Sequence, residues 1–160
     1  MNLNNDYTAE MVEFRRSFHR CPETGWTEFR TTAIIVRRLR ELGFEVLEGP
    51  QVINKDFVMG RYPDEVKAGM DRALKEGATE ADLAPMHGYT GAVGIWCTGR
   101  PGPVTALRFD IDALYIPETK DPEHIPNREG FASEHEGVMH ACGHDCHTGV
   151  GLALAHWIKD

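Results

Sequence analysis

The sequence predicts an α/β fold in which helices and short strands follow one another along the chain. Two observations carry this prediction: apolar residues recur at helical spacing in the first half, and two mostly apolar runs, 91–98 and 104–112, follow in the second. A chain of 160 residues can bury one core of ordinary size. We therefore expect a single compact unit with no linker and no internal repeat.

Two amphipathic helices are predicted before residue 43. Met11, Phe14 and Phe18 recur at helical spacing behind the candidate caps Asp6 and Thr8. A second apolar stripe consists of Phe29, Ala33, Val36 and Leu39, and it stops at Gly43, a residue typical of helix ends. The run 44–47 after that glycine is predicted to be a short strand.

The remaining elements follow from turn residues and apolar runs. Pro63 starts and Gly77 ends a third predicted helix. The runs 91–98 and 104–112, separated by a Gly- and Pro-rich turn, are predicted to be core strands, which such a turn could join as a hairpin. Residues 116–137 form a long acidic and Pro-rich loop, which suggests a functional excursion. A final helix is expected to begin near Thr148.

Composition excludes several classes of function. The net charge of −8 argues against nucleic acid and anionic lipid as partners. No apolar run approaches the roughly 18 residues of a membrane span, and the first six residues lack the features of an export signal. Four cysteines in such a chain are more typical of reduced thiols than of a disulfide framework. We expect a cytoplasmic protein without membrane contact.

Residues 140–147 carry the densest chemistry in the sequence. Three histidines, two cysteines and one aspartate fall within this segment, and these are ligand types that zinc and manganese accept. In an extended segment Cys142 and His144 share a face around Gly143, and this pair is the first choice of ligands. In a helix the pairs are instead His140 with His144 or Cys142 with Cys146, and the sequence leaves both geometries open.

Three other interpretations of this segment compete with a catalytic metal. A structural zinc site would need four ligands in two separated pairs. A thiol nucleophile would pair Cys142 with His144 or His147, oriented by Asp145. A buried cluster without metal is the simplest alternative, although it accounts poorly for so many ligand-type residues.

Asp110 and Asp112 end the apolar run 104–112. Residues two apart in a strand point to the same face, so the two carboxylates could hold a metal ligand or Arg108. The alternative is a solvated strand end.

Three segments resemble the M20 metallopeptidase family, and specifically its amidohydrolase branch. They are Asp110–Leu114, Met139–Thr148 and Phe18–Glu28. Four further segments sharpen the likeness within that branch: Gly25–Arg30, Met59–Gly60, Thr98–Pro103 and Gly130–Ser133. The resemblance runs through nearly the whole chain.

The resemblance implies a three-layer αβα, zinc-peptidase-like catalytic domain with a mixed central sheet, a smaller lid or dimerisation domain, and two divalent ions, Mn²⁺ or Zn²⁺. Cys142 and His144 fall on ligand positions of the branch, and Asp112 falls on a supporting aspartate. The implied reaction is hydrolysis of the amide bond of an N-acyl or N-aroyl amino acid, most concretely p-aminobenzoyl-glutamate. A homologous B subunit or self-association is the implied assembly.

The sequence departs from the family in length. Members are more than twice as long, and the glutamate that acts as general base lies beyond the equivalent of Asp160. Residues 1–160 are therefore expected to be the N-terminal part of the catalytic domain, with the rest of that domain and the lid absent. Alone they are expected to bind metal weakly and to be inactive. The rival hypothesis is a non-catalytic metal-binding or interaction module.

Overall fold

The computed structural model describes residues 6–160. The α-helices are α1 (Thr8–Arg20), α2 (Phe29–Glu41), α3 (Pro63–Lys75), α4 (Glu80–Leu83), α5 (Ile125–Arg128) and α6 (His144–Lys159). The 3-10 turns are η1 (Gly49–Gln51), η2 (Lys55–Phe57) and η3 (Ala84–Met86). The strands are β1 (Glu45–Glu48) and β2 (Ala92–Ile95). Residues 1–5 lie outside the described residues. The expectation that an export signal is lacking rests partly on them.

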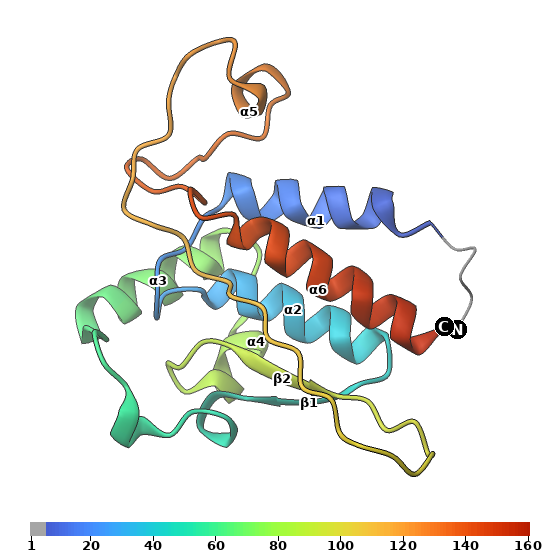
Figure 1. The fold of residues 1–160 in the computed structure, drawn as a ribbon. Coiled ribbons are helices and arrows are strands. Elements are labelled where there is room, and N and C mark those ends of the chain that lie inside the picture. Colours follow the sequence, from blue (N-terminus) through green and yellow to red (C-terminus); the bar gives the residue numbers. More distant parts are fainter. Residues whose placement is uncertain (1–5) are drawn as a thin grey trace.

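Helices α1, α6 and α2 lie side by side and form the largest layer of the molecule (Figure 1). The short sheet of β1 and β2 packs against α2, whereas α5 lies on a loop that projects beyond α1 and α6 (Figure 1). α1 and α6 approach closely at Gly149, where an added Cβ would lie 2.9 Å from the carbonyl oxygen of Met11. The small residue therefore permits this crossing.

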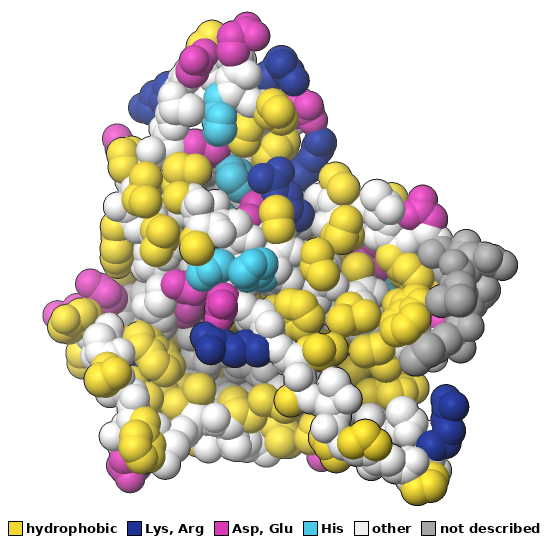
Figure 2. Space-filling model, viewed as in Figure 1, with side chains coloured by type: hydrophobic (Ala, Val, Ile, Leu, Met, Phe, Trp, Pro, Cys, Tyr) yellow, Lys and Arg dark blue, Asp and Glu magenta, His cyan; other side chains and the backbone are white. Residues whose placement is uncertain are grey.

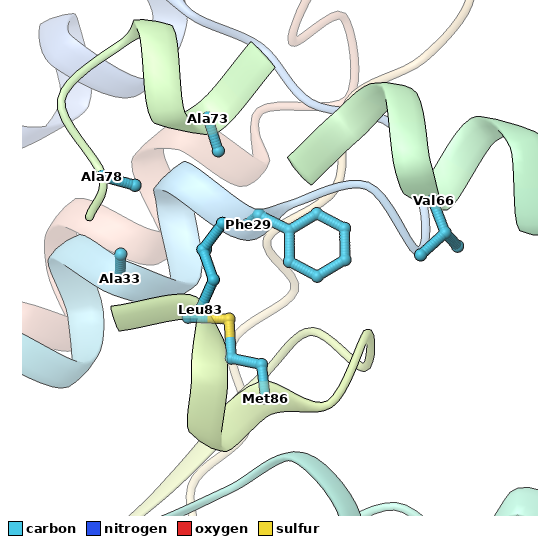
Figure 3. Close-up of a cluster of buried hydrophobic side chains, with 7 residues drawn as sticks. All are labelled: Phe29, Ala33, Val66, Ala73, Ala78, Leu83 and Met86. Carbon is cyan, nitrogen blue, oxygen red and sulfur yellow. The ribbon is translucent and has the colours of Figure 1, made fainter. Parts of the chain in front are cut away.

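The main apolar core lies between α2, α3 and the segment that follows α3 (Figure 3). It consists of Phe29, Ala33, Val66, Ala73, Ala78, Leu83 and Met86. Phe29 and Met86 are fully buried. Since removing a buried Phe side chain costs about 3–5 kcal/mol, Phe29 anchors α2 on this core.

A buried carboxylate fixes the start of α2. The side chain of Glu23 accepts hydrogen bonds from the backbone N–H groups of Arg30, at 3.1 Å, and Thr31, at 2.7 Å. These are two of the N–H groups that have no partner within the helix. Glu23 is wholly buried, so the cap also orders the chain between α1 and α2.

The predicted helices are confirmed, but two predictions about the second half are wrong. β2 pairs with β1 in antiparallel register, Glu45 opposite Ile95 and Glu48 opposite Ala92, and not with the run 104–112. That run forms no strand, because no other segment of residues 6–160 lies beside it as a ladder partner. Within those residues the sheet has two strands, so the mixed central sheet is not formed there.

α6 begins at His144, four residues before the predicted start. The preceding Gly143 has φ +86°, a left-handed conformation that glycine adopts at little cost. The buried Asp145 in the first turn favours an early start, since a carboxylate stabilises the N-terminal end of a helix dipole. Among residues 6–160 no helix has both the length and the apolar character of a membrane span.

Candidate metal centre

The candidate site lies where the end of the run 104–112 crosses the first turns of α6. A Cβ added to Gly151 would lie 2.9 Å from the ring of Phe109, so that ring packs directly on the helix backbone. One turn earlier, Thr148 Oγ1 lies 3.5 Å from the carbonyl oxygen of Asp110. These contacts fix the direction and position of the run along the helix.

Asp112 orients the imidazole of His144. Nδ1 of His144 lies 2.9 Å from Oδ1 of Asp112 and 3.0 Å from the carbonyl oxygen of the same residue. Both oxygens are acceptors, so Nδ1 carries the proton and donates it. In the neutral ring Nε2 then offers its lone pair, which is the arrangement found for metal-ligating histidines.

Asp110 and His147 lie on the same side of the helix as His144. One ligand atom from each of the three residues lies within 4.8 Å of the other two. His144 and His147 are one turn apart in α6, and their rings stack with centroids 5.1 Å apart. His147 is exposed and the other two are half-buried. Figure 2 shows histidine side chains beside acidic and basic ones at the centre of one face.

Cys142 does not belong to this group, within the part of the chain described. It is an exposed free thiol in the turn before Gly143, whereas His144 is the first residue of the helix. The turn before Gly143 is neither an extended strand nor part of the helix, so neither of the two geometries considered in the sequence analysis applies to it. The helix instead pairs His144 with His147, a residue that the sequence suggested only for a thiol mechanism.

His140, considered above as a helical partner of His144, is a buried residue outside α6. Its side chain is 5 % exposed, and neither ring nitrogen has a hydrogen-bond partner among residues 6–160. Burial lowers its pKa to about 4, so the ring is neutral near pH 7. A neutral imidazole with two unpartnered nitrogens needs a further group to satisfy it.

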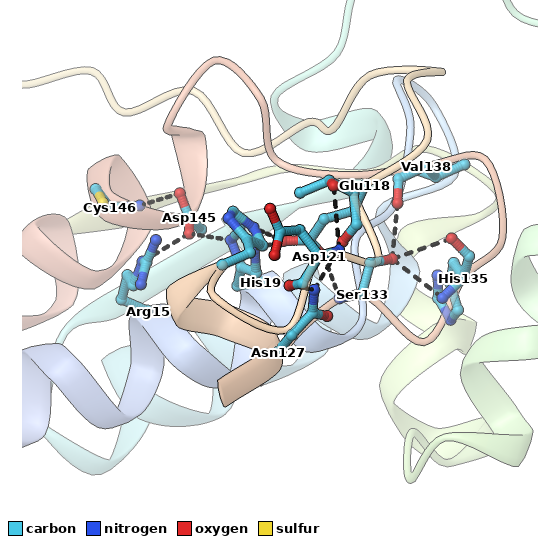
Figure 4. A network of polar contacts seen from close by, with 12 residues as sticks. Arg15, His19, Glu118, Asp121, Asn127, Ser133, His135, Val138, Asp145 and Cys146 are labelled. Atoms are coloured by element: carbon cyan, nitrogen blue, oxygen red, sulfur yellow. Dashed lines mark hydrogen bonds and ion pairs between the residues drawn. The ribbon is translucent and has the colours of Figure 1, made fainter. Parts of the chain in front are cut away.

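A polar network lies behind the first turn of α6 and joins it to the loop that carries α5 (Figure 4). His19 Nδ1 lies 2.8 Å from Asp145 Oδ2, and His19 Nε2 lies 2.9 Å from Glu118 Oε1. Arg15 Nε lies 2.8 Å from the same oxygen of Asp145. Burial lowers the pKa of His19, but the hydrogen bonds to the two carboxylates together outweigh it and raise the pKa above its ordinary value.

The pKa values of Glu118 and Asp145 shift in the opposite direction, below their ordinary values. Burial raises the pKa of each carboxyl group, yet the hydrogen bond from His19 and the other contacts leave both pKa values below their ordinary range. Glu118 also contacts His124 and accepts from the backbone N–H of Ser133. Since Asp145 is held by His19 and Arg15, it is not free to orient a histidine for a Cys142 nucleophile.

The donor set fits a divalent cation. Two imidazoles and a carboxylate within reach of one another are ligands of borderline metals, and the oriented His144 leaves Nε2 for coordination. The unpartnered nitrogens of His140 are a second sign that this region is built to hold another group.

Comparisons with known proteins define the class. Residues 106–160 match peptidase family M20/M25/M40. The solved structure of the Bacillus subtilis YXEP protein, a dinuclear metal-binding peptidase of the M20 family, is similar with a TM-score of 0.62 and 29 % identity over 94 % of this chain and 30 % of that one. The chain is similar to this family, and its α/β, peptidase-like fold class is confirmed.

Three further proteins have a higher sequence identity to this chain. An A-subunit homolog of p-aminobenzoyl-glutamate hydrolase from Haemophilus influenzae is 51 % identical over 99 % of this chain and 37 % of its own length. The indole-3-acetyl-aspartic acid hydrolase of Enterobacter agglomerans is 44 % identical over 99 % of this chain and 38 % of its own. The crystal structure of an aminobenzoyl-glutamate utilization protein from Klebsiella pneumoniae matches with a TM-score of 0.73 and 34 % identity, covering 96 % of this chain and 33 % of that one.

The chain thus spans less than two fifths of the length of the curated relatives it matches. The resemblance inferred from the sequence motifs is confirmed by these matches.

Proposed function

We propose that residues 1–160 are the metal-binding N-terminal part of the catalytic domain of a metal-dependent amidohydrolase. The observation that carries the proposal is the Asp112–His144 pair, which leaves Nε2 of an imidazole free in a group that also contains a second carboxylate, on Asp110. Similarity to the M20 family supports hydrolysis of an amide bond. The remainder of the catalytic domain and a lid domain would complete the enzyme.

We assign His144 and Cys142 as metal ligands and Asp112 as the residue that supports His144. The hydrogen bond from His144 Nδ1 to Asp112 fixes the ring and raises the basicity of Nε2, which favours metal binding. Cys142 is an exposed thiol two residues before His144, and its side chain is proposed to reach an ion that His144 holds. Two divalent cations, Mn²⁺ or Zn²⁺, would supply the positive charge that polarises the amide carbonyl.

The chain's own residues then contribute positioning. Phe109 and Thr148 hold the run 104–112 on α6, which positions Asp112 beside His144. The network of His19, Glu118 and Asp145 holds the loop of α5 beside the helix start. No carboxylate that serves as general base is assigned within the chain, and we place that residue in the rest of the protein.

The exposed run 104–107 supports the proposal that more of the domain packs here. Val104 is 98 % exposed and Leu107 is 57 % exposed, although both belong to an apolar run. Apolar side chains in a segment without a ladder partner are typical of a strand whose neighbours lie elsewhere. We propose that strands of the remaining domain pair with this run, and that self-association covers it when they are missing.

The proposed substrate is an N-acyl or N-aroyl amino acid, with p-aminobenzoyl-glutamate as the most specific candidate. It rests on 51 % identity with the A-subunit homolog of p-aminobenzoyl-glutamate hydrolase. A homologous B subunit is the proposed partner. The four free cysteines agree with a reducing compartment, and we propose the cytoplasm.

The test is hydrolysis by the complete gene product that contains this sequence. With Mn²⁺ or Zn²⁺ added it should release p-aminobenzoate from p-aminobenzoyl-glutamate, and His144→Ala should abolish release. His87→Asn, which removes an exposed histidine outside the site, is the matched control and should retain activity. Residues 1–160 alone should release nothing.

The alternative function, a non-catalytic metal-binding or interaction module, predicts a different result. A complete gene product that binds the cations but hydrolyses none of a panel of N-acyl and N-aroyl amino acids would support that alternative and contradict the proposed one.

A further inference from the structure

We infer that Tyr115 determines the acyl-group specificity of the protein, by binding the aromatic half of an N-aroyl amino acid against its ring. The inference rests on the proposed function, because it takes the reacting amide bond to lie at the proposed metal site. It adds the position of the acyl group and a preference for aromatic over aliphatic acyl groups, neither of which follows from the metal ligands.

Tyr115 lies close to the proposed metal site along the chain. Asp112, whose side chain lies 2.9 Å from Nδ1 of His144, precedes it by three residues. Three residues of chain span at most about 11 Å, so the backbone of Tyr115 lies within that distance of Asp112. Figure 1 shows this segment passing the start of α6 before it enters the loop of α5. A substrate whose amide bond is held at His144 can therefore extend its acyl group to Tyr115.

The segment that leads to the tyrosine already has hydrogen-bonding neighbours on both edges. The backbone N–H of Ala113 donates to the carbonyl oxygen of Glu23 at 2.7 Å. On the other edge, Leu114 and Met139 exchange two backbone hydrogen bonds, of 3.0 and 3.1 Å. The exposed run 104–107 has no such partners among residues 6–160. A missing strand therefore accounts for the exposure of that run but not for the exposure of the tyrosine.

Tyr115 is exposed and yet held in place. Its side chain is 68 % exposed. The hydroxyl group of the buried Thr24 donates to its phenolic oxygen at 3.2 Å. Thr24 is fixed in turn, because the hydroxyl group of Thr27 donates to its carbonyl oxygen at 2.8 Å. The ring is thus ordered before a ligand binds, which lowers the entropic cost of binding.

The residues beside Tyr115 fit an apolar ligand. Leu114 is 37 % exposed and Ile116 is 42 % exposed, and none of the three side chains carries a charge. Leu114 follows Asp112 by two residues in extended chain, so it lies on the same face of the segment as that carboxylate. Ligand sites are lined mostly by apolar and aromatic side chains with a few polar groups. The acyl half of an N-aroyl amino acid is apolar, whereas the amino acid half carries the carboxylates, so this surface fits the acyl half.

The tyrosine ring discriminates between aromatic and aliphatic acyl groups. Two aromatic rings in offset or edge-to-face contact gain roughly 2- to 10-fold in affinity beyond the effect of their buried area. A small acyl group such as acetyl makes no such contact. Because the ring contacts the acyl group equally in the ground state and in the transition state, its loss should raise KM and leave kcat unchanged.

Steady-state kinetics of the complete gene product with added Mn²⁺ tests the inference with two substrates, p-aminobenzoyl-glutamate and N-acetyl-glutamate. Tyr115→Ala should raise the KM for the aroyl substrate about tenfold, with kcat within about twofold. Both constants for the acetyl substrate should stay within about twofold. Tyr115→Phe keeps the ring and should keep the preference. Tyr62→Ala, which removes an exposed tyrosine just before α3, is the matched control and should behave as wild type.

Two kinetic results overturn the inference. An equal loss with both substrates in Tyr115→Ala would show that the residue supports the fold of the site and does not select the acyl group. An unchanged KM for the aroyl substrate would show that the acyl group binds elsewhere.

Calorimetric binding of p-aminobenzoyl-glutamate separates a failure of this inference from a failure of the proposed function. If the complete gene product hydrolyses neither substrate but binds the aroyl compound, and Tyr115→Ala weakens that binding about tenfold, the hydrolase function is contradicted and the inference is supported. If it hydrolyses N-acetyl-glutamate and neither binds nor hydrolyses the aroyl compound, the hydrolase function is supported and the inference is overturned. If it neither hydrolyses the two substrates nor binds the aroyl compound, both are contradicted.

Discussion

Oδ1 of Asp112 lies 2.9 Å from Nδ1 of His144, which ties the end of an irregular segment to the first residue of α6. The contact joins residues 32 positions apart and determines which ring nitrogen of the histidine is free. It is therefore the contact on which the proposed metal binding depends.

Asp112→Asn tests that contact. The amide oxygen keeps an acceptor for Nδ1 but removes the negative charge, so the ring becomes less basic at Nε2. Loss of such a supporting partner lowers metal affinity roughly 10–100-fold, and we expect a fall of that size for Zn²⁺ measured by calorimetry. Asp64→Asn, an exposed change in α3, is the control. Equal affinities for Asp112→Asn and wild type would show that the carboxylate has no supporting role.

His19→Gln tests the network behind the site. The change removes the positive charge of the imidazolium between two nearly buried carboxylates, Asp145 and Glu118. Removing one partner of a buried ion pair costs about 3–5 kcal/mol. Urea unfolding near pH 6 should show a loss of this order. A loss below about 1 kcal/mol would mean that the network contributes little.

The pH dependence of the same variant has a defined sign. The folded-state pKa of His19 is raised above 6.5, so its contribution is fully present below about pH 6.5 and is lost as the pH rises through the raised value. The pKa values of Asp145 and Glu118 are lowered, so their contribution is lost as the pH falls through those values. The difference in unfolding free energy between wild type and His19→Gln should therefore narrow at high pH. A difference that widened there would contradict the assignment.

Glu28→Gln tests a second buried carboxyl group. Burial raises the pKa of Glu28 to about 7, although Thr90 Oγ1 donates a hydrogen bond of 2.6 Å to it. A raised pKa means that folding favours the protonated form, so stability is lost as the pH rises from about 4.5 through about 7. The glutamine variant cannot ionise. It should match wild type near pH 4 and be more stable by about 3 kcal/mol at pH 8, measured by urea unfolding. Equal pH profiles would contradict the shift.

Gly149→Ala tests the crossing of α1 and α6. Alanine in a helix normally stabilises by up to about 1 kcal/mol relative to glycine. Here its Cβ would lie 2.9 Å from the backbone oxygen of Met11, which cannot move without displacing α1. We expect a destabilisation of about 1–3 kcal/mol by thermal unfolding. Val150→Ala, on the exposed side of the same helix, is the control. A stabilised Gly149→Ala would show that the helices are not in close contact.

The sequence predicted the helices well because each has its own periodic pattern and end signals. The stripe of Phe29 and Ala33 ending at Gly43, and the Pro63 start of α3, depend only on neighbouring residues. The run 104–112 was predicted as a strand because it is apolar, but a strand also needs a neighbour to pair with, and residues 6–160 supply none. Local patterns cannot show which segments become neighbours.

The same limit applies to the site. The motif identified His144 and Asp112, and the structure places them in contact. His147 as a neighbour of His144 could have been found from the i, i+3 spacing, had the helix been expected to start at His144 instead of Thr148. The partners of His19 could not be predicted from local sequence, because Asp145 and Glu118 are 126 and 99 residues away along the chain.

Anomalous diffraction from crystals of the complete gene product grown with Mn²⁺ tests the central claim most directly. A peak within coordination distance of His144 Nε2, with Asp112 still on Nδ1, is the predicted result. A fully occupied Mn²⁺ elsewhere, with no peak beside His144, would contradict it.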